Sequence, residues 1–337
     1  MLVVEDLVKH YRTREGTVRA VDGVSFTVER GETLGLVGES GCGKSTTAKM
    51  LVRLVEPTRG RILLDGDDVA AARGAALSRL RSRIQMVFQD PYASLDPRLT
   101  VAKTLDEVLA VRRIVRGETQ RRARVLELLE MVGLTAATAH RYPHQLSGGQ
   151  RQRVGIARAL AVQPEVIVLD EPVSALDVSV RAEVMNLLMR LREEAGLTYI
   201  FISHDLGMVR HISDRIAVMY LGRMLEVGGW QAVSDAPLHP YTRSLRDAVP
   251  VPDPDVESAR PVAALRGEVP DAVHPPAGCP FHTRCPHVEE RCRAEVPPLR
   301  EVVPAHRAAC HFSERLYPEQ VRATATARKN VRERSAG

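Results

Sequence analysis

The sequence predicts an α/β protein built around a parallel sheet. Two short, predominantly apolar runs, 166–169 and 199–203, have the composition of strands that are buried on both faces. A third run, 33–37, leads directly into a glycine-rich loop. Helical patterns separate these runs, and strands that alternate with helices are typical of a parallel sheet.

The other elements follow from local patterns. Residues 1–36 predict short β-branched strands, of which 24–28 is the clearest. Residues 103–133 and 179–195 carry apolar side chains at helical spacing, and another helix is expected after Leu146.

Length and composition restrict the class of protein. The chain has 337 residues, enough for two or three domains, with 26% charged and 44% hydrophobic residues, as in globular proteins. No apolar run approaches the roughly 18 residues of a membrane span, and residues 1–6 lack a secretion-signal pattern. The net charge of +5 is mild and does not indicate nucleic-acid binding.

The composition changes near residue 250. Seven prolines between Pro250 and Pro276 predict an extended connector. The tail from about residue 320 is expected to be disordered.

Four of the five cysteines are crowded near the C-terminal end, separated by five, six and seventeen residues: Cys279, Cys285, Cys292 and Cys310. Four thiolates can hold a [4Fe–4S] cluster or Zn²⁺. The spacing fits no short zinc ribbon, although four histidines could replace a sulfur in a zinc site: His282, His287, His306 and His311. A cluster, zinc, and free thiols or a disulfide pair all stay open.

Residues 38–46 form a glycine-rich loop with the pattern G-x-x-x-x-G-K-[ST], between an expected strand and an expected helix. Glycines let successive backbone N–H groups face phosphate oxygens, and the helix N-terminus adds a partial positive charge. Lys44 is expected to reach the β- and γ-phosphates, and Ser45 to ligate Mg²⁺. The other expected nucleotide-binding residues of the loop are Gly38, Ser40, Gly41, Gly43 and Thr46.

Two acidic residues, Asp170 and Glu171, follow the apolar run 166–169. A carboxylate at the C-terminal end of a strand beside a phosphate loop is well placed to associate with Mg²⁺. Glu171 is then placed to orient or deprotonate the attacking water. With the loop, this pair predicts a nucleoside triphosphatase.

A second phosphate-binding helix start lies at 146–150. Ser147 is a good N-cap residue, and the two glycines after it expose backbone N–H groups to an anion. One γ-phosphate needs only one phosphate loop, so the second start is expected to serve a nucleotide held by another subunit.

Together these motifs resemble those of ATP-binding cassette (ABC) nucleotide-binding subunits, over residues 1 to about 230. The resemblance implies a RecA-like P-loop ATPase core with an antiparallel β subdomain and an α-helical subdomain, to which this chain adds a C-terminal Cys-rich extension. None of the motifs departs from the family pattern; besides the phosphate loop they are Gln89, 146–150, 166–171, 174–177 and His204.

The resemblance also implies roles for single residues. Glu171 is the catalytic base, His204 contacts the γ-phosphate, and Tyr11 stacks on the adenine. Gln89 contacts the metal and senses the γ-phosphate, which gives three residues at Mg²⁺: Ser45, Gln89 and Asp170. Four more residues contact the partner's ATP or carry signals across the dimer: Ser147, Gly149, Gln150 and Asp177.

The stretches 89–98 and 239–243, followed by the cysteines, are similar to dipeptide/oligopeptide permease ATP-binding subunits, of which some carry a [4Fe–4S] cluster in this region. This similarity covers the whole chain, though only loosely after about residue 315. Taken alone, 239–242 could be a plain turn.

The similarity implies a peptide importer at the cytoplasmic face of the cell membrane. The implied partners are a second ATP-binding subunit, making a heterodimer, two transmembrane permease subunits and, indirectly, an extracytoplasmic substrate-binding protein; nucleic acid is not among them.

Other classes of protein share part of these features. Nickel and glutathione importers share most of these features. DNA-repair members of the family carry a long coiled coil between phosphate loop and signature, which this chain lacks, and translation-associated members usually carry two cassettes. An iron–sulfur redox protein with an accessory ATPase is disfavoured by the complete motif set.

Six units are expected along the chain. They are the first part of the ATPase core with the β subdomain (1–88), the helical subdomain (89–145), the second part of the core (146–230), a regulatory linker (231–277), the Cys-rich metal or cluster module (278–315) and a basic tail (316–337).

Overall fold

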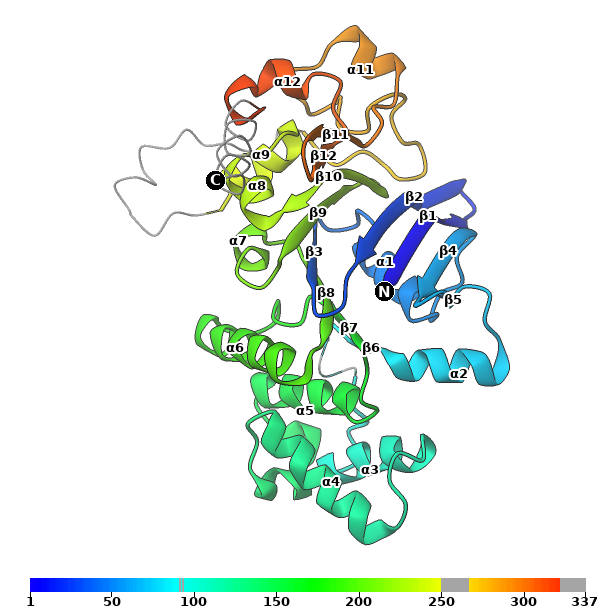
Figure 1. Ribbon diagram of the computed structural model, residues 1–337, viewed down its shortest axis with the longest axis vertical. Helices are drawn as coiled ribbons and strands as arrows, with labels where there is room; N and C mark the ends of the chain where they lie inside the picture. Colours follow the sequence, from blue (N-terminus) through cyan, green and yellow to red (C-terminus); the bar gives the residue numbers. More distant parts are fainter. Residues whose placement is uncertain (91, 93, 250–266, 322–337) are drawn as a thin grey trace, which may run out of the picture.

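The computed structural model describes residues 1–90, 92, 94–249 and 267–321 (Figure 1). Most of the expected proline-rich connector and the tail beyond residue 321 therefore lie outside the described residues. Among the described helices, none combines the length and the apolar character that a membrane span requires.

An eight-stranded sheet forms the centre of the molecule. The five strands on one side of it, from the edge strand β6 to β9, are parallel, and β10 runs antiparallel to β9. In sheet order the strands are β11 (Arg300–Val303), β12 (His306–Ala308), β10 (Arg223–Gly229), β9 (Arg215–Tyr220), β3 (Thr33–Val37), β8 (Thr198–Ser203), β7 (Val166–Asp170) and β6 (Ile84–Val87).

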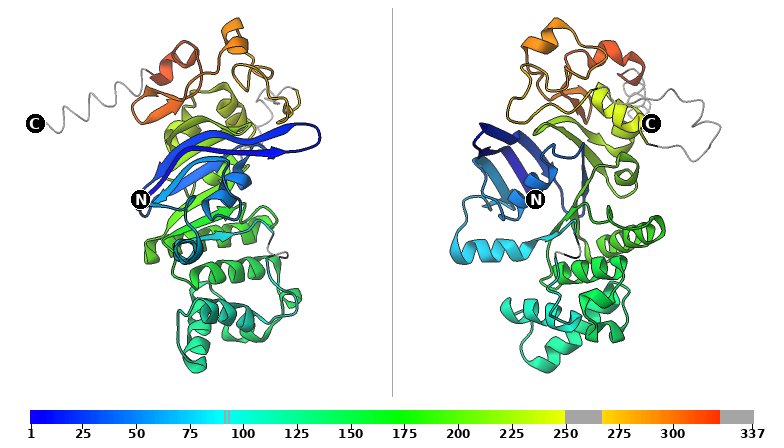
Figure 2. Two further views of the ribbon diagram at one scale, coloured as in Figure 1. Left: turned by 90° about the vertical axis from the view of Figure 1, so that its right-hand side faces the viewer. Right: turned by 180° about the vertical axis from the view of Figure 1, so that it is seen from behind.

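A four-stranded antiparallel sheet lies beside this core (Figures 1 and 2). Two long strands, β1 and β2, form a hairpin where short strands were expected. Their pairing continues through several shifts in register. In sheet order the strands are β2 (Thr17–Val28), β1 (Leu2–Arg12), β4 (Arg59–Leu64) and β5 (Asp67–Asp68).

The strands of the core sheet are buried on both faces. Along β7, Val166 and Val168 pack with the antiparallel sheet and with α1 (Lys44–Leu51), whereas Ile167 and Leu169 pack with the helices on the other face. The alternation follows from the two-residue period of a strand.

The helices on that other face extend away from the sheet. Those of residues 101–145 lie at the end of the molecule that is farthest from the C-terminal segment, residues 267–321 (Figures 1 and 2). The expected helical stretch 103–133 is two helices, α3 and α4, because Arg113 (φ 54°) and Gly117 (φ 86°) adopt left-handed backbone conformations between them. The helices on this side are α3 (Val101–Val111), α4 (Glu118–Met131), η1 (Ala136–His140), η2 (Pro143–Gln145), α5 (Gly148–Leu160) and α6 (Val178–Ala195).

Residues 239–242 begin a helix, α9 (Pro240–Asp247), and do not form a plain turn. His239 is the N-cap, and its Nδ1 accepts a hydrogen bond from the Tyr241 backbone N–H at 3.0 Å. Pro240 occupies the first helical position, where a missing N–H has no cost. The other helices in the described part of the chain are α2 (Gly74–Arg83), α7 (Leu206–Val209), α8 (Trp230–Asp235), α11 (Glu290–Ala294) and α12 (Ser313–Leu316).

The C-terminal segment is attached to the core through β12, which pairs with β10. Behind this pair the buried carboxylate of Glu226 lies 2.6 Å from His306 Nε2. The same carboxylate accepts the backbone N–H groups of Leu238 and His239 at 2.7 and 3.0 Å. These bonds satisfy a side chain that is fully removed from solvent.

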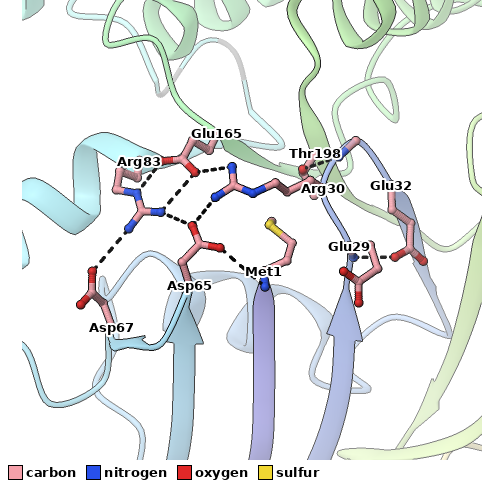
Figure 3. Close-up of polar contacts among 10 residues, drawn as sticks. Met1, Glu29, Arg30, Glu32, Asp65, Asp67, Arg83, Glu165 and Thr198 are labelled. Atoms are coloured by element: carbon pink, nitrogen blue, oxygen red, sulfur yellow. Dashed lines mark hydrogen bonds and ion pairs between the residues drawn. The ribbon is translucent and has the colours of Figure 1, made fainter.

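A network of ion pairs joins the antiparallel sheet to the core (Figure 3). Arg83, at the end of α2, donates to Glu165 at 2.5 Å and also to Asp65 after β4. Arg30, in the turn before β3, contacts the same two carboxylates at 3.0 and 2.5 Å. Two guanidinium groups thus bridge two acids from separate parts of the chain.

This network predicts a pH-dependent contribution to stability. Hydrogen bonds from Arg83 lower the pKa of Glu165, so the stabilisation is present above the ordinary glutamate pKa and is lost as the pH falls through the lowered value. We expect Arg83→Gln to lower the free energy of unfolding by about 1 kcal/mol near neutral pH, and by much less once the pH has fallen below the lowered pKa of Glu165. Urea unfolding across that pH range measures the difference.

Arg79→Gln is the matched control, because Arg79 is exposed on the same helix. A difference between wild type and Arg83→Gln that stays constant down to acid pH would contradict this assignment.

Candidate active site

A cavity of about 600 Å³ opens where β3, β7 and β8 end. Gln89, Glu171 and His204 line it, together with Val18 and Ala20 of β2. Most of its remaining wall is the phosphate loop and the start of α1: Glu39, Ser40, Gly41, Gly43, Lys44, Ser45 and Thr46.

The phosphate loop is folded by close backbone packing. Gly43 has φ 105°, and a Cβ there would lie 2.1 Å from the Ala20 carbonyl oxygen. A Cβ at Gly38 would lie 2.1 Å from the carbonyl oxygen of Met219. Only glycine fits at these two positions. Cys42, which lies between them in the sequence, is buried, and burial raises the pKa of its thiol.

Lys44 begins α1, and its ammonium group turns back over the loop. The Nζ atom donates to the carbonyl oxygens of Gly38 at 2.6 Å and Glu39 at 2.9 Å. The positive charge of Lys44 therefore lies at the N-terminus of α1. Both the charge and the helix dipole favour binding of anionic phosphates there.

Asp170 and Ser45 meet beneath the loop. Ser45 Oγ donates to Asp170 Oδ1 at 2.9 Å, and Asp170 is only 4% exposed. Burial raises the pKa of Asp170, although the hydrogen bond from Ser45 opposes the shift. A hydroxyl and a carboxylate are hard oxygen ligands of the kind Mg²⁺ prefers, so this pair fits the metal.

Glu171 lies at the centre of the polar groups. Its Oε2 atom is 3.1 Å from Gln89 Nε2 and 3.3 Å from His204 Nδ1. Its backbone is in the left-handed region, with φ 46°, which is strained for a non-glycine residue and common at functional sites. Two residues predicted from separate motifs, Gln89 and His204, therefore converge on one carboxylate oxygen of Glu171.

Other predicted site residues lie away from the cavity lining. Tyr11 is 37% exposed and pairs across the hairpin with Val18, which does line the cavity. Its predicted stacking on adenine stays a prediction.

The signature residues begin α5. Ser147 and Gln150 form a reciprocal capping box, with bonds of 3.2 and 3.1 Å. Gly149 packs so closely that a Cβ would lie 2.3 Å from Val180. Asp177 caps α6 by accepting the Val180 N–H at 2.9 Å. None of these four predicted residues lines the cavity of its own chain.

Residues from the C-terminal third also reach the site, although no sequence motif marks them as site residues. Ala272 lines the cavity, and its carbonyl oxygen accepts the Arg19 N–H of the β1–β2 hairpin at 3.2 Å. Arg284 and Tyr241 contact Glu39 of the phosphate loop. No local pattern predicts such pairings, although Tyr241 belongs to the 239–243 motif.

The four clustered cysteines line one small cavity of about 10 Å³ with Phe281 and several histidines. All are free thiols, so the disulfide alternative is not realised. Backbone N–H groups from two residues further on contact three of the sulfurs: Phe281 at Cys279, His287 at Cys285 and Phe312 at Cys310. Within the described part of the chain, however, no three Cys, His, Asp or Glu side chains are arranged as a metal site.

The fold and the cavity define a P-loop nucleotide-binding protein, and comparisons with known proteins narrow the class. Residues 21–174 match the model of the ABC transporter family, and residues 225–292 match that of the oligopeptide/dipeptide transporter C-terminal region.

A probable peptide ABC transporter ATP-binding protein of Sinorhizobium fredii is 52% identical over 92% of this chain and 89% of its own length. A putative oligopeptide transport ATP-binding protein of Bacillus subtilis is 50% identical over 93% of this chain and 95% of its own length.

Among solved structures, the ATP-binding cassette MJ0796, as a dimer bound to ADP and phosphate, is similar with a TM-score of 0.63 and 34% identity, covering 68% of this chain and 99% of that one. The chain therefore belongs to the ABC transporter ATP-binding proteins, in the family that carries the oligopeptide/dipeptide transporter C-terminal region.

The close packing around Gly43 predicts that adding one methyl group at this position, in Gly43→Ala, weakens ATP binding. Gly43→Ala puts a Cβ against the Ala20 carbonyl in a strained backbone conformation, so we expect ATP to bind about tenfold more weakly or worse. Equilibrium binding of a fluorescent ATP analogue measures the loss. Gly155→Ala is the control, because a Cβ there has no neighbour within 4 Å; equal affinity in the two variants would contradict the prediction.

Proposed function

We propose that this ABC ATPase powers the import of oligopeptides as one of two cassettes beneath a pair of permease subunits. The relatives described as peptide and oligopeptide transport ATP-binding proteins support this substrate class. The match of residues 225–292 to the oligopeptide/dipeptide transporter C-terminal region supports it independently.

The observation that carries the hydrolytic role is that Glu171 lines the same cavity as Lys44. Glu171 accepts the proton of the attacking water as general base. Gln89 and His204 approach its Oε2 atom at 3.1 and 3.3 Å and fix the orientation of the carboxylate. His204 also contacts the γ-phosphate, while Lys44 and the loop N–H groups neutralise the developing charge.

Ser45, Asp170 and Gln89 are the proposed holders of Mg²⁺. When bound there, Mg²⁺ would neutralise part of the negative charge of the phosphates. Asp170 is buried and Ser45 donates to it, so both ligand atoms are already oriented toward each other.

The second cassette completes the site. Ser147 and Asp177 are exposed, as is the apolar side chain of Val178 at 80%. These residues lie outside the chain's own cavity, which suits contact with ATP held by a partner. The similar cassette MJ0796 is described as dimeric. We propose a heterodimer in which Ser147, Gly149 and Gln150 contact the partner's nucleotide and Asp177 carries signals across the interface.

The remaining partners follow from the same proposal. The helical part, residues 89–145, contacts the two transmembrane subunits at the cytoplasmic face of the membrane, and an extracytoplasmic binding protein delivers the peptide. We propose that the six units expected from the sequence are the structural parts of this ATPase subunit.

We also propose that Cys279, Cys285, Cys292 and Cys310 bind a [4Fe–4S] cluster, with Zn²⁺ as the alternative. The donor set has the right chemistry: all four cysteines line one cavity, and three of the sulfurs accept backbone N–H groups, which are favourable neighbours for metal-bound thiolates. The cavity of about 10 Å³ is close to the size of one water, so a cluster requires the cysteines to rotate outward, whereas zinc requires less movement.

Metal content decides between these alternatives. We expect protein purified without oxygen to be brown and to contain iron and acid-labile sulfide, and Cys292→Ser to remove both. Cys42→Ser is the control, because Cys42 lies in the phosphate loop and should leave the colour intact. Colourless protein that contains stoichiometric zinc would reject iron, and protein without either metal would reject the site.

Glu171→Gln tests the catalytic base. The amide keeps the size of the side chain but cannot accept the proton of water, so we expect hydrolysis to fall by about two to four orders of magnitude while ATP binding is retained. Phosphate release by the assembled transporter and nucleotide binding by the isolated chain measure the two effects.

Glu193→Gln, an exposed position on α6, is the matched control. Normal turnover of Glu171→Gln would remove this residue from the mechanism.

A further inference from the structure

The phosphate loop is held from outside the cassette core by Arg284, which lies between Cys279 and Cys285 in the C-terminal segment. Arg284 Nη1 donates to Glu39 Oε2 at 2.6 Å, and Nη2 donates to Oε1 at 3.0 Å. The arginine side chain is only 4% exposed, and the glutamate side chain 22%. Glu39 immediately follows Gly38, so this bidentate ion pair holds the first residues of the loop in place.

An aromatic cluster keeps Arg284 in place. Tyr220, Tyr241 and Phe281 are fully buried, with ring centroids 4.7 to 5.5 Å apart. Arg284 Nη1 also lies 3.4 Å from Tyr220 Oη, and Tyr241 Oη accepts the backbone N–H of Glu39 at 2.8 Å. Both the backbone and the side chain of Glu39 are therefore bound by residues beyond position 219.

The charge of Glu39 makes this contact relevant to nucleotide binding. Glu39 lines the same cavity as Lys44, and its carbonyl oxygen accepts a bond from Lys44 Nζ at 2.9 Å. An uncompensated carboxylate at this point would repel the phosphates of ATP. Arg284 neutralises the carboxylate and at the same time fixes the backbone that contacts Lys44.

We propose that Arg284 is a positioning residue for ATP binding, which neutralises Glu39 and braces the phosphate loop from the C-terminal segment. The proposal rests on the ATPase function proposed above and adds to it a residue outside the cassette motifs. It gives the C-terminal segment a direct part in nucleotide affinity.

Arg284→Gln in the full-length protein is the first test. Glutamine keeps much of the length but not the charge, so Glu39 is left uncompensated. We expect the Kd for ATP and the KM to rise about tenfold, with kcat changed much less, because Glu171 and His204 are not displaced. Arg284→Lys keeps the charge and should lose less affinity than Arg284→Gln.

The double variant Arg284→Gln with Glu39→Gln separates charge from folding. Removing the carboxylate removes the repulsion, so most of the lost affinity should return. Arg291→Gln is the matched control, because Arg291 forms an exposed ion pair with Glu295 in the same segment. Circular dichroism and thermal unfolding accompany each binding measurement.

Wild-type affinity in Arg284→Gln would overturn the proposal. So would a loss of affinity that the double variant does not restore although it folds normally, because the role of Arg284 would then be structural only. Should Arg284→Gln fail to fold, Arg284→Lys and the double variant decide: the proposal requires both to bind ATP within a few fold of wild type. Failure of the wild-type protein itself to bind ATP would instead reject the proposed function.

Discussion

The parallel pairing of β3 with β8, and of β8 with β7, is the constraint on which the active site depends. Val37 pairs with Ser203, and Asp170 pairs with Ile202, so the three strands end at nearly the same level of the sheet. The phosphate loop, the acidic pair and His204 each follow one of these ends. A shift in register would separate Glu171 from Lys44 and would turn buried strand residues to the wrong face.

Several carboxylates gather where an anionic ligand binds, and each is compensated in a different way. Asp170 is buried, which raises its pKa, and it accepts a hydrogen bond from Ser45. Glu171 lies between the side chains of Gln89 and His204. Glu39 is paired with Arg284. The site thus combines a high density of negative groups with a local partner for each of them.

The parts that could be predicted from the sequence are those fixed by local chemistry. The strands at 33–37, 166–169 and 199–203 and the phosphate loop were predicted correctly, because apolar runs and glycine spacing act within a few residues. The break between α3 and α4 was not predicted, because the apolar spacing does not show the left-handed backbone conformations at Arg113 and Gly117. The Arg284–Glu39 pair joins residues 245 positions apart, a distance over which no motif can be recognised. The domain boundaries and the adenine contact of Tyr11 stay predictions.

The position of Ala272 against the β1–β2 hairpin has a consequence for how the protein is made. A ribosome releases the phosphate loop early, but Ala272 of the cavity wall and Arg284, the partner of Glu39, are synthesised only after more than two hundred further residues. A nascent chain that already displays Lys44 therefore has an unfinished pocket with an uncompensated acid in it. The lining of the cavity and the ion pair of Glu39 are therefore complete only once synthesis has passed residue 284.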